Sequence, residues 1–160
     1  MTTDNGFRIP APLGRLLGSL PRRPGSQLFV MGLNVALAPH LPVDSISMLE
    51  GRSLRIEVTD ACLRFDYTWR GNAFRAADHG TTPPDLTIRA HAWDFHQLLR
   101  RGEDPDTLFF SRRLVMEGDT ELGLWVKNTL DSLDIELLRP GRVLAGLLSV
   151  PGIGLRTPGN

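Results

Sequence analysis

The N-terminal part of the chain carries apolar residues at helical spacing. Four leucines recur at i, i+3, i+4 and i+7 and share one face of a helix predicted over 12–20: Leu13, Leu16, Leu17 and Leu20. The segment 26–38, "SQLFVMGLNVALA", is apolar on every side, which favours a second helix that is buried. The segment "VDSISMLEG" predicts a short helix that stops at Gly51.

From residue 52 the apolar positions recur every 2 residues, as in a strand, instead of about every 3.6, as in a helix. In "RSLRIEV" (52–58) and "CLRFDYTW" (62–69), apolar and polar residues alternate, which is typical of half-buried antiparallel strands with one solvated face. The sequence "RGN" at 70–72 predicts a hairpin turn. Two further strands are predicted at 73–77 and 85–90.

Two helices and one more strand follow. Residues 91–101 predict a helix, and "DPDTLFF" predicts a short helix with Asp104 as N-cap and Pro105 at its first position. The segment "RRLVMEG" (112–118) predicts the fifth strand.

The end of the chain is helical again. Asp119 is expected to cap a helix that runs to about residue 133, and 141–150 predict a last apolar helix. The order of elements predicts an α+β domain, with a five-stranded, mostly antiparallel sheet covered by helices on one face.

The composition fits a single globular domain in a reducing compartment. The chain has 160 residues, of which 41% are hydrophobic and 22% charged. Cys62 is the only cysteine, so no internal disulfide can form, and we expect a cytoplasmic protein. No apolar run is long enough for a transmembrane helix, and we expect no signal peptide.

The zero net charge conceals an uneven distribution along the chain. Residues 1–43 form an apolar segment whose bases include Arg15, Arg22 and Arg23, and residues 137–160 form an apolar segment without acids. The central residues 44–136 carry 17 acidic and 11 basic residues, a net charge of −6. We therefore divide the chain into these three parts and expect the basic ends to contact an anionic surface such as a membrane. Nucleic acid is a poor fit to the acidic centre.

Enzyme chemistry is not indicated. The four histidines are too scattered for a metal site, which needs about three convergent ligands, so no metal or cofactor is expected. Cys62 has no neighbouring histidine, so we expect it to fill space as a small side chain rather than to act as a nucleophile. Nucleophile-elbow, phosphate-loop and zinc-protease motifs are absent from the sequence.

The segment "LFFSRRLVM" sets aromatic residues beside arginines. Phe109 and Phe110 lie about 100° apart on a helix, so one is expected in the core and the other at a cavity or partner surface. Arg112 and Arg113 point to opposite faces if they begin the strand, with Arg112 in phase with the apolar face. Such an arginine suits a phospholipid phosphate; the alternative is a surface ion pair with Asp104, Asp106 or Glu117.

The stretch 104–128, "DPDTLFFSRRLVMEGDTELGLWVKN", resembles the signature of the ubiquinone biosynthesis accessory factor UbiT family, whose members contain a sterol-carrier-protein type-two domain. The similarity is strong from Asp104 to Asp131 and continues loosely to "LEGRSLRIEVTD" at 49–60. The resemblance implies a hydrophobic tunnel between sheet and helices and a non-enzymatic, lipid-binding role in oxygen-independent ubiquinone synthesis. Implied partners are ubiquinone intermediates or other lipids, and the proteins UbiU and UbiV. The arginines and the basic ends add an acidic phospholipid and the membrane surface as expected partners.

Given this expected fold, the apolar and basic positions of the sequence suggest candidate site residues. The expected cavity lining is apolar and comprises Trp93, Phe95, Leu98, Phe109, Phe110, Leu114, Met116, Leu124 and Trp125. The expected headgroup or membrane contacts are Arg112, Arg113, Arg15, Arg22, Arg23, Leu13, Leu16, Leu17 and Leu20. The alternative is a scaffold or homodimer that uses the same apolar ends to bind protein and carries no lipid.

Overall fold

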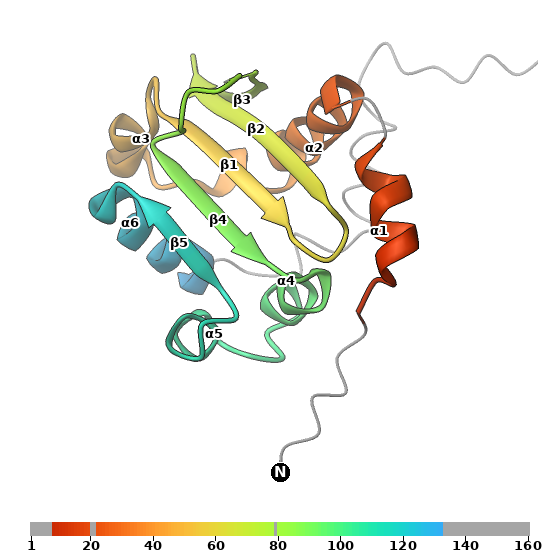
Figure 1. The fold of residues 1–160 in the computed structure, drawn as a ribbon. Coiled ribbons are helices and arrows are strands. Elements are labelled where there is room, and N and C mark those ends of the chain that lie inside the picture. The colour runs from red at the N-terminus through yellow and green to blue at the C-terminus, as the bar shows by residue number, and fades with distance from the viewer. Residues whose placement is uncertain (1–7, 20–21, 79, 133–160) are drawn as a thin grey trace, which may run out of the picture.

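The computed structural model describes residues 8–19, 22–78 and 80–132 of the chain, and Figure 1 shows their arrangement. The strands are β1 (Ser53–Val58), β2 (Leu63–Arg70), β3 (Ala73–Ala76), β4 (Leu86–Ala90) and β5 (Val115–Gly118). The helices are α1 (Ala11–Gly18), α2 (Arg22–Ala36), the 3-10 turn η1 (Ala38–His40), α3 (Val43–Leu49), α4 (Ala92–Leu99), α5 (Pro105–Phe110) and α6 (Thr120–Ser132).

The five strands form one sheet in the order β3-β2-β1-β4-β5. Strands β1 and β4 pair in parallel, and the other three pairs are antiparallel. This confirms the predicted five-stranded, mostly antiparallel α+β fold. The predicted hairpin at 70–72 is also confirmed: Gly71 and Asn72 both have positive φ, as a two-residue type I′ turn requires.

The two faces of the sheet differ in chemistry. One face is apolar and carries Leu54, Tyr67, Trp69, Leu86 and Ile88, all buried. Helices α2, α3 and α6 cover this face and lie behind the sheet in Figure 1. The two-residue alternation read from the sequence therefore predicts the inner face correctly.

The opposite face carries ion pairs across neighbouring strands. Arg55 Nε lies 2.6 Å from Asp66 Oδ1, and Arg89 bridges Glu57 at 2.6 Å and Glu117 at 2.7 Å. Cross-strand pairs of opposite charge stabilise the sheet in this register.

Two elements begin three or more residues away from the start predicted from the sequence. Helix α2 begins at Arg22 rather than residue 26, because Pro24 falls in the first turn, where a missing N–H costs nothing. The fifth strand begins at Val115 rather than Arg112, because the chain is still turning out of α5 there. The predicted helix at 141–150 lies outside the described residues.

The predicted helix caps are confirmed. The Asp104 carboxylate accepts a hydrogen bond from the Thr107 amide at 2.8 Å, and Pro105 opens α5. The Asp119 carboxylate accepts one from the Leu122 amide at 3.1 Å at the start of α6.

Two aspartates join segments that are distant in sequence. Asp60, in the β1–β2 turn, accepts from the amides of Ala92 at 2.8 Å and Ile9 at 3.1 Å. Burial opposes ionisation, but these amides outweigh it and hold the pKa of Asp60 below its ordinary value. The pKa of Asp85 is also lowered, chiefly by the hydrogen bond that its carboxylate accepts from the Ser53 amide.

We expect the free energy of unfolding to fall in acid because of these carboxylates. A pKa lowered by folding adds stability that is complete above the ordinary carboxyl pKa of about 4 and is lost as the pH falls through the folded pKa. Urea unfolding between neutral pH and about pH 3 measures the loss. Asp85→Asn should give a flatter profile; a profile that this substitution leaves unchanged would contradict the role of Asp85.

Candidate functional site

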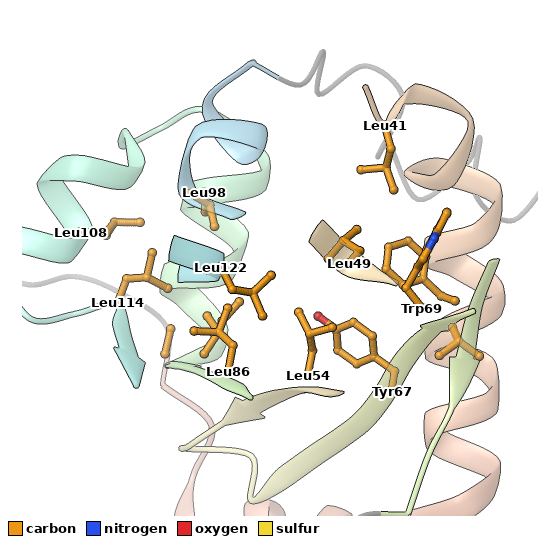
Figure 2. Close-up of a cluster of buried hydrophobic side chains, with 14 residues drawn as sticks. Leu41, Leu49, Leu54, Tyr67, Trp69, Leu86, Leu98, Leu108, Leu114 and Leu122 are labelled. Atoms are coloured by element: carbon orange, nitrogen blue, oxygen red, sulfur yellow. The ribbon is translucent and has the colours of Figure 1, made fainter. Parts of the chain in front are cut away.

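The apolar core between the sheet and the helices is the first part of the candidate site. Its fully buried side chains come from five elements and the α5–β5 turn, as Figure 2 shows: Leu49, Trp69, Leu86, Leu108, Leu114 and Leu122. Around them lie half-buried apolar residues, including Phe29 and Leu33 of α2 and Ile46 of α3. Sheet and helices thus enclose a layer whose surface is almost entirely hydrocarbon.

The structure divides the nine predicted lining residues into three groups. Leu98 and Leu114 are buried in the core, and Phe95, Met116 and Trp125 pack against it. Phe109, Phe110 and Leu124 are exposed at the surface, by 41%, 80% and 55%. Trp93 lies on the other side of the sheet, stacked on His96. Whether a lipid contacts these residues stays a prediction.

The exposed phenylalanines lie on α5, which projects at one end of the sheet (Figure 1). Their rings contact each other edge to face, with centroids 5.9 Å apart. The expectation that one of them enters the core is wrong. Leu108 fills the core position of this two-turn helix instead, with no exposed surface.

Helix α5 ends in a left-handed turn at Arg112. The Arg113 amide donates to the Leu108 carbonyl and the Arg112 amide to the Phe109 carbonyl, both at 3.0 Å, which is the Schellman pattern. Arg112 has a φ of 60°, a conformation that glycine adopts more easily. This turn breaks the strand alternation, so Arg112 does not share the inner face with Leu114 and Met116 as expected.

The two arginines differ in their partners. Arg113 donates to Asp94 at 2.9 Å and to Glu103 at 2.6 Å, and Glu103 in particular raises the pKa of Arg113. Within the described chain, the Arg112 guanidinium takes part in no ion pair, so the surface pair considered for it with Asp104, Asp106 or Glu117 is not formed.

Both arginines line a pocket of about 370 Å³ on the polar side of the sheet. Its lining holds more positive than negative side chains: Arg8, Arg89, Arg112 and Arg113 against Asp94 and Glu117, with His91 and Trp93 beside them. Arg89 and Arg113 are each paired with two carboxylates, so Arg112 is the arginine of this lining whose charge we expect to suit an anionic group.

Helix α1 docks on the β1–β2 turn through its glycines. Gly14 is buried so closely that a Cβ there would lie 2.4 Å from the Asp60 carbonyl oxygen. Leu13 and Leu16 point away and are 46% and 66% exposed. The side chains of Leu17, Leu20, Arg22 and Arg23 lie outside the described part of the structure, and Arg15 is exposed.

Two features of the site were missed from the sequence. Gly14 and Gly18, four residues apart, marked the docking face of α1, whereas only the leucines were considered. Trp69 lies on the apolar phase of the strand predicted at 62–69, and it brings an unpaired indole N–H into the apolar layer. The sequence signal for this feature was a tyrosine or tryptophan at an inward-facing strand position, because such an aromatic side chain carries a polar atom.

Some kinds of site are not found in the part of the chain that is described. Over residues 8–19, 22–78 and 80–132, no three His, Cys, Asp or Glu side chains gather as a metal site would require. Over the same residues, no helix has both the length and the apolar character to span a bilayer.

Comparisons with known proteins agree with this geometry. Residues 43–131 match the model of the SCP-2 sterol transfer family. Over 91 residues the chain is 44% identical to the "Ubiquinone biosynthesis accessory factor UbiT" of Escherichia coli strain K12. The matched segment covers 57% of this chain and 51% of the relative. The same figures hold for the protein of that description in Escherichia coli O157:H7. The chain thus spans about half the length of the curated relatives it matches.

A solved structure, described as "UbiJ-SCP2 Ubiquinone synthesis protein", has the same fold. It superposes with a TM-score of 0.54 at 22% identity and covers 69% of this chain and 97% of its own.

Proposed function

The chain belongs to the SCP-2 sterol transfer family, and on this premise we propose that it is a lipid-binding accessory factor for ubiquinone biosynthesis and not an enzyme. The observation that carries the proposal is the 44% identity to UbiT over 91 residues. We further propose that it binds isoprenoid-quinone intermediates or an acidic phospholipid between the sheet and the helices. Burial of hydrocarbon alone supplies affinity there, at about 0.8 kcal/mol for each buried CH₂.

The proposal includes a setting for this activity. The protein acts in the cytoplasm at the membrane surface, in the oxygen-independent branch of the pathway, with UbiU and UbiV as its partners. The exposed Leu13 and Leu16 on α1 and Phe110 on α5 support a membrane contact, because apolar side chains at a charged surface suit a lipid interface.

The first test is to extract the purified full-length protein with organic solvent and identify the lipids by mass spectrometry. Near-stoichiometric quinone, quinone precursor or phospholipid is the expected result. An extract without lipid from folded protein would overturn the proposal and favour a protein scaffold.

Arg112 is proposed to contact a lipid phosphate, since its side chain is exposed and lines the pocket on the polar side of the sheet. One arginine near an anionic surface contributes about 1 kcal/mol, so Arg112→Gln should weaken binding to phosphatidylglycerol vesicles about fivefold at low salt. Vesicle co-sedimentation measures the effect. The matched control is Arg70→Gln, which removes the same charge from the β2–β3 hairpin, at the opposite end of the sheet from α5 (Figure 1). Equal losses in the two variants would indicate a response to net charge and exclude a local contact.

A further inference from the structure

The pocket of about 370 Å³ lies outside the apolar layer between the sheet and the helices. Arg89 and Glu117, on the opposite face of the sheet, line it, so the sheet separates the two. The antiparallel pairing of Arg89 with Val115 brings the segment after β4, with His91, beside the segment before β5, with Arg112. Clefts from about 300 Å³ upward hold small ligands. We call this cleft the polar-face pocket.

His91 carries a free hydrogen-bond acceptor at this pocket. The Thr59 hydroxyl donates to the Ala90 carbonyl at 3.3 Å, so it accepts from His91 Nδ1, which lies 3.0 Å away. The Asp60 carboxylate, 3.8 Å from the same nitrogen, favours a proton there. In the neutral imidazole the other nitrogen, Nε2, then has a free lone pair. Among the described residues, no group donates to Nε2, and the His91 side chain is 41% exposed.

Arg112 brings an unpaired charge to the same pocket. Arg89 and Arg113 are each paired with two carboxylates, whereas the Arg112 guanidinium takes part in no ion pair of the described chain. A guanidinium binds a phosphate through two parallel N–H···O hydrogen bonds. The polar-face pocket thus combines a cation for a phosphate group with an acceptor for a hydroxyl group.

The surroundings of the pocket suit a lipid surface. Phe109 and Phe110, with 41% and 80% of their surface exposed, precede the turn at Arg112. Trp93 is half-buried and lines the pocket, and its ring stacks on His96 with centroids 5.2 Å apart. Exposed phenylalanines beside a tryptophan are typical of segments that contact a membrane interface. A phospholipid headgroup therefore fits the pocket better than a soluble anion.

We propose that the polar-face pocket binds the headgroup of a membrane phospholipid that carries headgroup hydroxyls, such as phosphatidylglycerol. Arg112 binds the phosphate, and a headgroup hydroxyl donates to His91 Nε2. Trp93 lies at the level of the headgroups. The hydrocarbon chains of this lipid stay in the bilayer, so the site is separate from lipid binding between the sheet and the helices. This inference rests on the proposed membrane contact and adds the headgroup class and the residues that select it.

The test compares vesicles of phosphatidylglycerol with vesicles of phosphatidylpropanol, a lipid of the same charge whose headgroup has no hydroxyl. Co-sedimentation of the full-length protein measures the ratio of the two affinities. Because phosphatidylpropanol lacks one hydrogen bond to His91, the wild type is expected to bind it about fivefold more weakly. His91→Phe should abolish this preference. Arg112→Gln should weaken binding to both lipids by a similar factor, because both carry the phosphate.

His40→Phe is the matched control, because His40 is exposed in η1 and does not line the pocket. This variant should keep the preference for phosphatidylglycerol. The His91 side chain makes no cap hydrogen bond to α4, so His91→Phe should leave the helix intact, which urea unfolding checks. The comparison of the two lipids with the wild type needs no variant and stands even if His91→Phe unfolds.

Three results would contradict different parts of the inference. Equal affinity of the wild type for the two lipids, or a preference that survives in His91→Phe, would overturn the headgroup assignment and leave the proposed function standing. Glycerophosphoglycerol is the same headgroup without acyl chains. If it bound as tightly as the vesicles in isothermal titration calorimetry, the ligand would be soluble and the membrane source would be wrong. A wild type that binds neither kind of vesicle would contradict the proposed membrane contact itself.

Discussion

Replacing Leu13 and Leu16 together by serine is expected to weaken binding to anionic vesicles roughly a hundredfold. Both side chains are largely exposed on α1, and a leucine that becomes buried contributes about 1.5–3 kcal/mol, so two partly exposed ones together supply enough for that factor. The free energy of unfolding should change by less than about 0.5 kcal/mol, because neither side chain is in the core. Co-sedimentation and urea unfolding measure the two quantities.

The control for this variant uses exposed apolar residues on other helices. Leu28 of α2 is 64% exposed and Val43 of α3 is 83% exposed, so their replacement by serine removes a similar amount of apolar surface. We expect this pair to bind vesicles like the wild type. A loss as large as that of the α1 variant would show that the contact is not confined to α1.

Replacing Gly118 by alanine is expected to reduce the free energy of unfolding by about 3 kcal/mol or more. Gly118 ends β5 with a φ of 125°, and a Cβ there would lie 2.2 Å from the Asp85 carbonyl oxygen. That oxygen also accepts the Asp119 amide at 2.8 Å, at the start of α6. Backbone atoms cannot move aside cheaply, so the β4–β5 edge and α6 must shift together.

Gly71→Ala separates the steric effect from the backbone effect. Gly71 also has a positive φ, of 57°, but a Cβ there meets nothing within 4 Å. The cost should be only the left-handed conformation, about 1 kcal/mol. Urea unfolding of the two variants measures the difference, and similar losses would contradict the close contact at Gly118.

The sheet was predictable because its determinants are local. Alternation in 52–58 and 62–69 separates the two faces without knowledge of any partner strand. The turn at Gly71 and Asn72 needs only residues that tolerate positive φ, and the cap at Asp104 needs only its own helix. Such features depend on neighbours a few residues away.

The site was less predictable because it depends on contacts between distant segments. The alternation rule placed Arg112 on the apolar face, but a left-handed residue after α5 turns it to the polar side. Helical spacing could not decide which face of α1 docks, since that depends on the fit of Gly14 against Asp60. The pairing of Arg113 with Asp94 and Glu103 joins α4, the loop after it and the α5–β5 turn.

By itself the sequence determined the fold class, the inner face of the sheet and, through its similarity at 104–128, the family, because hydrophobic period and turn chemistry are encoded locally. Only the tertiary structure decided that Phe109 and Phe110 face outward and that the Trp69 indole N–H lies unpaired in the core. A pattern states which residues are apolar, but the packing of helices on the sheet determines which polar atoms lose their water and find no protein partner.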